Sequence, residues 1–401
     1  MMNRLNLMLV AGARPNFMKI APLVRAIEQH NTNRRNGDPQ IDYKLVHTGQ
    51  HYDPRMSTIF FQELGMPAPH INLGVGSGSH AVQTATVMTR FEPMLESARP
   101  DWLVVVGDVN STLACTLVAA KLGVRVAHVE AGLRSFDRSM PEEINRLATD
   151  ALADLLLTPS EDADRNLAAE GVDGARIRRV GNIMIDSLNA QLQSIDTLEL
   201  IARRDLVPGE YIYVTLHRPA NVDQPDTLQL VMGRLTELAR KWTIIFPVHP
   251  RTRSRLADCE PVQSVPSGLR VVEPVGYRES LAFVRHARCV LTDSGGLQEE
   301  STFFRTPCLT LRPNTERPVT LTCGSNRLTT PEDLEHDLAD VLARPARFGE
   351  IPPLWDGHTA GRTLQAILEA SGFGSKHVTE DRLLQHSSRP EEAQLLSPSA
   401  V

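Results

Sequence analysis

Short apolar strands alternate with amphipathic helices along this chain, and this alternation constrains the fold more than any other feature of the sequence. The apolar run at residues 5–10 is followed by Ile20, Leu23, Val24 and Ile27, which recur at helical spacing. Further apolar runs in the first half lie at residues 103–106, 124–129 and 155–158, and a helix is expected near residues 112–122. Continuous apolar strands that alternate with helices are typical of a parallel sheet covered on both faces.

The second half starts the same pattern again. Its expected strands lie at residues 211–216, 243–248, 269–272, 290–292 and 308–311. A chain of 401 residues exceeds what one hydrophobic core usually supports. We therefore predict an α/β fold with two Rossmann-like, doubly wound domains that face each other across a cleft. The expected ranges are 1–188 for the first domain, 189–355 for the second, 356–373 for a terminal helix and 374–401 for a flexible tail.

Composition excludes several classes of protein. A net charge of −6 argues against binding to nucleic acid, and no apolar run approaches the roughly 20 residues of a membrane span. The five cysteines are odd in number and form no CxxC pair, which favours a reduced, cytoplasmic setting without disulfides or a thiolate metal site. Neither a Walker lysine loop nor a GxGxxG motif is present, which argues against a mononucleotide kinase and a dinucleotide cofactor.

Two strand-to-helix junctions suit an anion. Ser294, Gly295 and Gly296 follow the strand at 290–292 and begin a helix, where backbone N–H groups and the helix dipole point at a ligand. The alternative interpretation of residues 294–296 is a tight turn with a serine N-cap and no bound anion. Arg14 and Lys19 add positive charge after the first strand of the chain.

Acidic residues follow successive strands of the first half. Asp108 and Glu130 come directly after two apolar strands, and Glu142 lies at an expected helix start. Any one of these carboxylates could simply cap a helix. Three of them at neighbouring strand ends favour a shared pocket, because ligands of such sheets bind at the carboxyl ends of the strands.

Histidines and an arginine occupy matching places in the second half. His217 and His249 each follow a strand, and a structural hydrogen bond is the simpler role for His249. Arg317 follows the strand at 308–311 and suits a pyrophosphate, since its planar guanidinium donates paired hydrogen bonds. The alternative for Arg317 is a salt bridge to Glu316 or Glu300.

From about residue 5 to residue 370, the chain resembles the non-hydrolysing UDP-N-acetylglucosamine 2-epimerases. The resemblance rests on an ordered set of motifs, GARPNFMKIAPL, VVVGDVNST, HVEAGLRS, MPEEINR, VGNIMIDSL, TLHR, FPVHP, LTDSGGLQEE and TERP. It implies the two-domain fold called GT-B, conversion of UDP-N-acetylglucosamine to UDP-N-acetylmannosamine, a homodimer, and no metal or cofactor.

The resemblance also implies roles for individual residues. Those expected at the reacting sugar are Asp108, Glu130, Glu142 and His217. Those expected to bind the substrate are Arg14 and Lys19 at the phosphates, Arg146 near the substrate, Ser294, Gly295, Gly296 and Arg317 at the pyrophosphate, and Glu300 at the ribose hydroxyls.

Some positions depart from the family pattern. Asn16 replaces an acidic residue, Val319 ends a motif that usually reads TERPE, and Ser280 stands where an aromatic residue often packs on the uracil. Many bacterial members need a second substrate molecule as an activator. Gln50, His51, Arg218 and His249 match that activator site, whereas Asp53, Pro219 and residues 74–78 do not, so we expect a weak or absent activator requirement.

The expected chemistry is elimination of UDP followed by its re-addition. Departure of UDP builds positive charge at C1 and acidifies the hydrogen on C2, and one of the three carboxylates removes that proton. The alternatives are a hydrolysing epimerase, a GT-B glycosyltransferase and a non-catalytic regulator that binds a nucleotide sugar.

Overall fold

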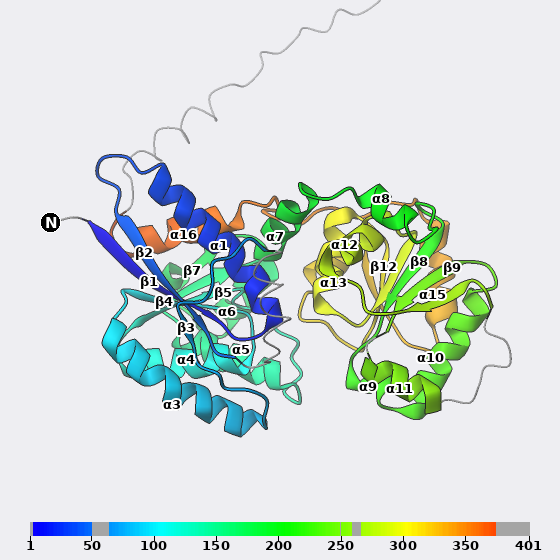
Figure 1. The fold of residues 1–401 in the computed structure, drawn as a ribbon, viewed down its shortest axis with the longest axis horizontal. Helices are drawn as coiled ribbons and strands as arrows, with labels where there is room; N and C mark the ends of the chain where they lie inside the picture. The colour runs from blue at the N-terminus through cyan, green and yellow to red at the C-terminus, as the bar shows by residue number, and fades with distance from the viewer. Residues whose placement is uncertain (1–2, 50–63, 249, 259–265, 374–401) are drawn as a thin grey trace, which may run out of the picture.

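The protein folds into two α/β domains, each built on one parallel sheet (Figure 1). The computed structural model describes residues 3–49, 64–248, 250–258 and 266–373. The first sheet has seven strands in the order β3-β2-β1-β4-β5-β6-β7, and the second has six in the order β10-β9-β8-β11-β12-β13. In each sheet the order reverses beside the first strand of the domain, which confirms the prediction of two doubly wound domains.

The first domain buries both faces of its sheet. Its strands are β1 (Arg4–Ala11), β2 (Gln40–His47), β3 (Ile71–Asn72), β4 (Trp102–Val106), β5 (Arg125–Val129), β6 (Leu155–Thr158) and β7 (Ile177–Arg179). Its helices are α1 (Arg14–Thr32), α3 (His80–Ala98), α4 (Asn110–Lys121), α5 (Pro141–Leu152), α6 (Glu161–Ala169) and α7 (Ile183–Leu192). Along β1, Leu7 and Leu9 pack with α1, whereas Met8 and Val10 pack with α3 and α4. The alternation follows from the two-residue period of a strand.

The second domain follows the same plan. Its strands are β8 (Tyr211–Thr215), β9 (Thr243–Pro247), β10 (Leu269–Val272), β11 (Cys289–Thr292), β12 (Cys308–Leu311) and β13 (Asn326–Thr329). Its helices are α8 (Thr197–Ala202), α9 (Pro219–Val222), α10 (Pro225–Leu238), α11 (Pro250–Asp258), α12 (Tyr277–His286), α13 (Gly295–Phe304), α14 (Val319–Thr322) and α15 (Leu334–Ala343). The five strands expected in this half are all present. The structure also has a sixth strand, β13, which the sequence analysis did not predict.

The final helix, α16 (Thr359–Ala370), returns to the first domain, where it packs on α1 and α7 (Figure 1). Its apolar side chains, among them Leu364 and Ile367, join the core beneath α1. Helix α7 also packs against α12 and α13 of the second domain. The predicted boundary at residue 188 thus falls within a helix that both domains contact, and the division at that residue stays a prediction.

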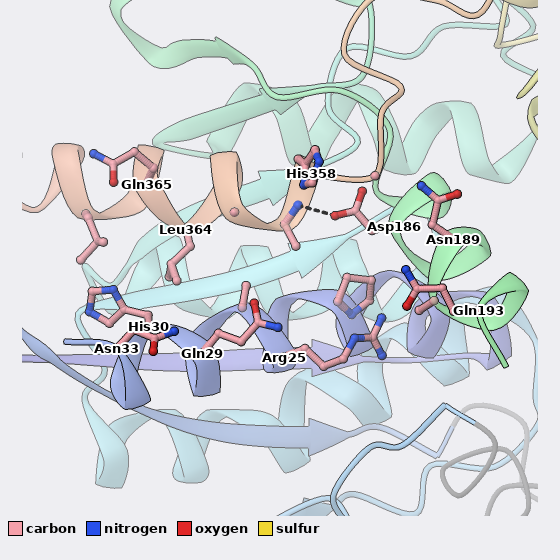
Figure 2. Close-up of a pocket in the computed structure, with 17 residues that line it drawn as sticks. Arg25, Gln29, His30, Asn33, Asp186, Asn189, Gln193, His358, Leu364 and Gln365 are labelled. Carbon is pink, nitrogen blue, oxygen red and sulfur yellow. Dashed lines mark hydrogen bonds between the residues drawn. The ribbon is translucent and has the colours of Figure 1, made fainter. Parts of the chain in front are cut away.

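A groove of about 600 Å³ lies between α1, α7 and α16 (Figure 2). Arg25 of α1, Asp186 of α7 and Gln365 of α16 are among its lining residues. None of the site residues expected from the sequence lines it, so this groove is separate from the candidate site. Among the helices of the described residues, none combines the length and the apolar character needed to cross a membrane.

Removal of the Asp186 carboxylate should weaken the attachment of α16. Asp186 accepts hydrogen bonds from the backbone N–H groups of Thr359 and Ala360, at 3.1 and 2.8 Å, and so caps this helix. Asp186→Ala should lower the free energy of unfolding by about 0.5–2 kcal/mol, the range for loss of an N-cap. Denaturant titration measures the change. Glu369→Ala, on the exposed side of α16, is the control and should change stability by less than about 0.5 kcal/mol; equal losses in both variants would contradict the capping role.

Candidate functional site

Helix α1 and the loop after β5 bring Lys19 and Glu130 together. Lys19 reaches from α1 and forms an ion pair with the Glu130 carboxylate, and both side chains are largely buried. Glu130 has φ of 74°, a conformation that L-residues rarely adopt. Gly107 directly follows the neighbouring strand β4, and a Cβ atom there would lie 2.9 Å from Lys19 Nζ. Glycine at position 107 therefore leaves the space that the lysine occupies.

Arg317 of the second domain completes a buried cluster of charges around Glu130. A guanidinium nitrogen of Arg317 lies 3.2 Å from Glu130 Oε1, and its Nε lies 2.7 Å from Glu299 Oε1. We call the following residues the interdomain ion cluster, which has three basic and three acidic side chains: Lys19, Glu130, Glu299, Arg312, Glu316 and Arg317. The cluster joins the carboxyl ends of the two sheets.

The charges of the cluster set the ionisation of its members. Burial alone would raise the pKa of Glu130, but Lys19 and Arg317 outweigh burial and hold that pKa below its ordinary value. Burial also acts to lower the pKa of Arg317, and the carboxylates of Glu299, Glu316 and Glu130 raise it well above the ordinary value instead. At neutral pH, Glu130 is therefore a carboxylate and Arg317 a cation.

Asp108 is held by Arg146 of α5. Arg146 donates to the Asp108 carboxylate at 2.5 Å and to Glu143 at the same distance. Glu143 is itself fixed, because it accepts the backbone N–H groups of Ser135 and Phe136. The side chain of Asp108 remains 30% exposed, so it is oriented and still accessible. Sequence reasoning assigned Arg146 to the substrate and missed Glu143, which lies in the same MPEEINR motif.

The third expected carboxylate, Glu142, is only partly buried at the start of α5. It interacts electrostatically with Arg218 of the second domain. Asp108, Glu130 and Glu142 thus lie on the side of the first domain that faces the second.

His217 follows β8 and is oriented by Asp293. Its Nδ1 lies 2.9 Å from the Asp293 carboxylate, which also accepts the backbone N–H groups of His217 and Arg218. Burial alone would raise the pKa of Asp293, but its bonds to His217 and Asn221 lower it, so Asp293 is ionised. Nδ1 therefore carries the proton, and the ring is 58% exposed with Nε2 available to a ligand. Asp293 was missed, although it precedes Ser294 in the motif that predicted the anion site.

Helix α13 begins beside Arg317, as the anion-site hypothesis requires. A Cβ atom at Gly295 would lie 2.5 Å from a guanidinium nitrogen of Arg317, so only glycine permits this approach. Ser294 is the N-cap of the helix, and its side chain makes no capping hydrogen bond. The backbone N–H groups of this first turn and the guanidinium therefore lie next to each other.

Of the two salt bridges that the sequence offered for Arg317, the one to Glu316 is present. The partner from α13 is Glu299 and not Glu300. Successive helix residues point about 100° apart, so Glu300 is directed to Tyr277 of α12 instead. Burial raises the pKa of Glu300 to about 8, and Glu299 adds to this effect. Contact between Glu300 and a ribose stays a prediction.

Two of the positions that depart from the family pattern, Asn16 and Ser280, make hydrogen bonds within the protein. Asn16 accepts the N–H of Ala13 at 2.9 Å and donates to the Val106 carbonyl at 2.9 Å, and a carboxylate could not make the second bond. Ser280 bonds to the hydroxyl of Tyr213. Asn16 thus holds the start of α1 against the end of β4.

Other expected ligand-binding residues lie partly or wholly outside the described residues. Arg14 is the first residue of α1, and its side chain is not among the described parts of the structure. Arg218 donates to the Asp293 carbonyl at 3.0 Å. Gln50, His51 and His249 lie outside the described residues, so the activator site stays a prediction.

Among the described residues, one group has the composition of a metal site, and it lies away from the candidate site. His336, Asp337 and Asp340 share a face of α15. Arg327 already pairs with both aspartates, at 2.6 and 3.2 Å. None of the residues expected at the substrate belongs to this group.

Comparison with known proteins identifies the family of the chain. A family model described as UDP-N-acetylglucosamine 2-epimerase matches residues 33–368. A UDP-N-acetylglucosamine 2-epimerase of Methanocaldococcus jannaschii is 41% identical over 331 residues, which is 81% of this chain and 88% of that protein. The UDP-2,3-diacetamido-2,3-dideoxy-D-glucuronate 2-epimerase of Pseudomonas aeruginosa is 38% identical over 327 residues, again 81% of this chain and 88% of the relative.

Solved structures show the same fold. The crystal structure of the M. jannaschii UDP-GlcNAc 2-epimerase in complex with UDP-GlcNAc and UDP superposes with a TM-score of 0.79 and 38% identity. The match covers 92% of this chain and 100% of that one. These structural neighbours have the GT-B-like arrangement expected from the sequence. By its family match, its relatives and its fold, the chain belongs to the UDP-N-acetylglucosamine 2-epimerase family.

Proposed function

We propose that this protein interconverts UDP-N-acetylglucosamine and UDP-N-acetylmannosamine at C2 without net hydrolysis. The observation that carries the proposal is the contact between Glu130 and Arg317, 3.2 Å apart, beside the start of α13. Glu130 of one domain is the proton acceptor that we propose, and Arg317 of the other domain is the proposed phosphate-binding cation. The reaction needs these two groups at adjacent atoms, C2 and C1, of one sugar.

In the first half of the proposed reaction, the bond between C1 and the pyrophosphate oxygen breaks, and its electron pair leaves with UDP. Arg317 and the N–H groups at the start of α13 stabilise the charge that grows on the pyrophosphate. A carboxylate takes the proton from C2, and the C–H electrons form a C1–C2 double bond. No oxidant, reductant or water is consumed.

The second half reverses these steps on the other face of C2. UDP adds back to C1, and a protonated group delivers a proton to C2 from the opposite side, which inverts that centre. Glu130 is ionised and suits the proton acceptor, and Asp108 and Glu142 are the accessible groups for the opposite face. Asp293 fixes the His217 ring through Nδ1, and the doubly protonated ring would donate from Nε2 to the departing phosphate.

The P. aeruginosa relative makes a second sugar a specific candidate, because a UDP-linked diacetamido uronic acid is named as its substrate. The reaction would be the same and the sugar substituents would differ. Assembly as a homodimer and a cytoplasmic location are further proposals that rest on the resemblance.

Incubation with UDP-N-acetylglucosamine in D2O tests the reaction. The expected products are both C2 epimers with deuterium at C2, because the abstracted proton exchanges with solvent, and little free UDP. Proton NMR follows both outcomes in one sample, and a parallel sample with the diacetamido uronic acid tests the second sugar. Stoichiometric UDP and free N-acetylmannosamine would show a hydrolase, and retention of the C2 hydrogen would exclude elimination. A glycosyltransferase or a non-catalytic regulator would leave the sugar nucleotide unchanged without an acceptor.

Neutralising the proposed carboxylates should separate catalysis from binding. Asp108→Asn and Glu130→Gln should each lower kcat by at least about a hundredfold, the scale of general acid–base groups. The affinity for UDP should stay the same in Asp108→Asn and stay the same or rise in Glu130→Gln, because Arg317 loses one competitor for its N–H groups. Steady-state kinetics and calorimetry measure the two quantities. Glu161→Gln, on the exposed surface of α6, is the control; a carboxylate variant as active as this control would be structural.

Substitution of Arg317 should act on UDP binding. Arg317→Lys keeps the charge that Glu130, Glu299 and Glu316 require, but loses the paired hydrogen bonds. The affinity for UDP should fall by roughly ten- to a hundredfold, as expected for loss of about 1.5–3 kcal/mol in a charged hydrogen bond. Calorimetry measures this change.

Arg317→Ala is the contrasting variant. It leaves three buried carboxylates short of a cation, which should cost about 3–5 kcal/mol of stability. An unchanged affinity for UDP in a folded Arg317→Lys protein would remove this arginine from the binding site.

A further inference from the structure

His128 lies at the centre of the first domain and takes no part in the reaction as proposed above. It sits in β5, two residues before Glu130, and its side chain is fully buried. Its Nδ1 lies 2.6 Å from Asp150 Oδ1, and its Nε2 lies 2.9 Å from the carbonyl oxygen of Gly107. Both nitrogens of a buried imidazole thus have partners close to the candidate site.

Both partners of His128 can only accept a hydrogen bond. The Gly107 carbonyl has no proton to give. Asp150 is ionised, because His128 and Arg134 overcome the effect of burial and keep the pKa of Asp150 low. Its other oxygen, Oδ2, accepts the N–H of Gly132 at 3.0 Å and of Arg134 at 2.7 Å, and these two bonds stabilise the ionised carboxylate. Two acceptors require two donors, so the ring carries a proton on each nitrogen.

These bonds connect the three segments that carry the candidate carboxylates. Gly107 directly precedes Asp108, and Gly132 lies two residues after Glu130. Asp150 belongs to α5, where Glu142, Arg146 and Asp150 recur every four residues and therefore share one side of the helix. Arg146 of the same side binds Asp108. The His128–Asp150 pair is thus bonded to the loop of Asp108, the loop of Glu130 and the helix of Glu142.

We propose that His128, as a buried imidazolium paired with Asp150, is a positioning residue that fixes the three carboxylates of the sugar site relative to one another. A ring with one proton could satisfy only one of its two neighbours and would leave the other acceptor unpaired in the core. The proposal rests on the proposed function for its kinetic test, and its spectroscopic test is independent of any activity.

The spectroscopic test uses the wild-type protein labelled with 15N and 13C in histidine. The two ring nitrogens of His128 are assigned through correlations with the Cβ atom of the same residue. At pH 7, each of them should show a directly bonded proton. A ring with a single proton would overturn the proposal. This result depends only on the bonds to Asp150 and Gly107, so it holds or fails whether or not the protein epimerises a sugar.

The kinetic test uses two variants that each keep one of the two bonds. In His128→Asn, the new amide nitrogen lies near the position of Nδ1 and can still donate to Asp150. In His128→Gln, the new amide nitrogen lies near the position of Nε2 and can still donate to the Gly107 carbonyl. Each variant should lose roughly ten- to a hundredfold in kcat, the scale expected when reacting groups are slightly misplaced. The affinity for UDP should be unchanged in both, because among the described residues His128 contacts none of those proposed to bind the pyrophosphate.

His286→Gln is the matched control, because His286 is a partly buried histidine of α12 that bonds Thr197 at 2.9 Å, away from the carboxylates. It should keep the wild-type kcat. Full kcat in folded His128→Asn and His128→Gln would overturn the positioning role, and so would equal losses in kcat and in affinity for UDP. If wild type itself shows no exchange at C2, the proposed function fails while the ring spectrum still decides the state of His128.

Discussion

The ion pair between Glu130 and Arg317 is the contact on which the organisation of the site depends. It joins the two domains at a buried position, where an unpaired charge would be costly. Each domain nevertheless balances its own share of the interdomain ion cluster. The first domain contributes one cation and one anion, and the second contributes two of each. Each domain therefore brings equal numbers of basic and acidic side chains to the contact.

On the proposed function, the same cluster would couple ligand binding to the basicity of Glu130. A pyrophosphate bound at the start of α13 would compete with the carboxylates for the N–H groups of Arg317. Because Arg317 is one of the cations that lower the pKa of Glu130, its engagement by phosphate lets that pKa rise. A stronger base is then present when the sugar is in place, and Lys19 still holds the carboxylate in position. On the proposed function, the cluster thus links recognition of UDP to removal of the C2 proton.

The sequence predicted strands correctly where a short run of apolar residues marks a strand buried on both faces. The strands at 155–158, 269–272 and 308–311 are short apolar runs, and their bounds agree with β6, β10 and β12. It failed for β2, whose first half has exposed and half-buried polar residues and lacks a continuous apolar run. It also could not choose between neighbours such as Glu299 and Glu300. Their sequence context is the same, and only the rotation of α13 decides which carboxylate meets Arg317 and which meets Tyr277.

Each domain contains a buried aspartate that binds a histidine and the backbone of a strand-end loop, and the two pairs differ in one physical respect. Asp150 binds His128, whose two nitrogens both meet protein acceptors in the core. Asp293 binds His217 through Nδ1 only, and that ring is 58% exposed. A histidine with both nitrogens engaged can give nothing to a ligand and can only hold its neighbours in place. A histidine with one nitrogen engaged keeps a fixed orientation and presents the other nitrogen to the cleft. On the proposed function, the same pair of residue types would therefore serve as internal support in the first domain and as a ligand-facing group in the second.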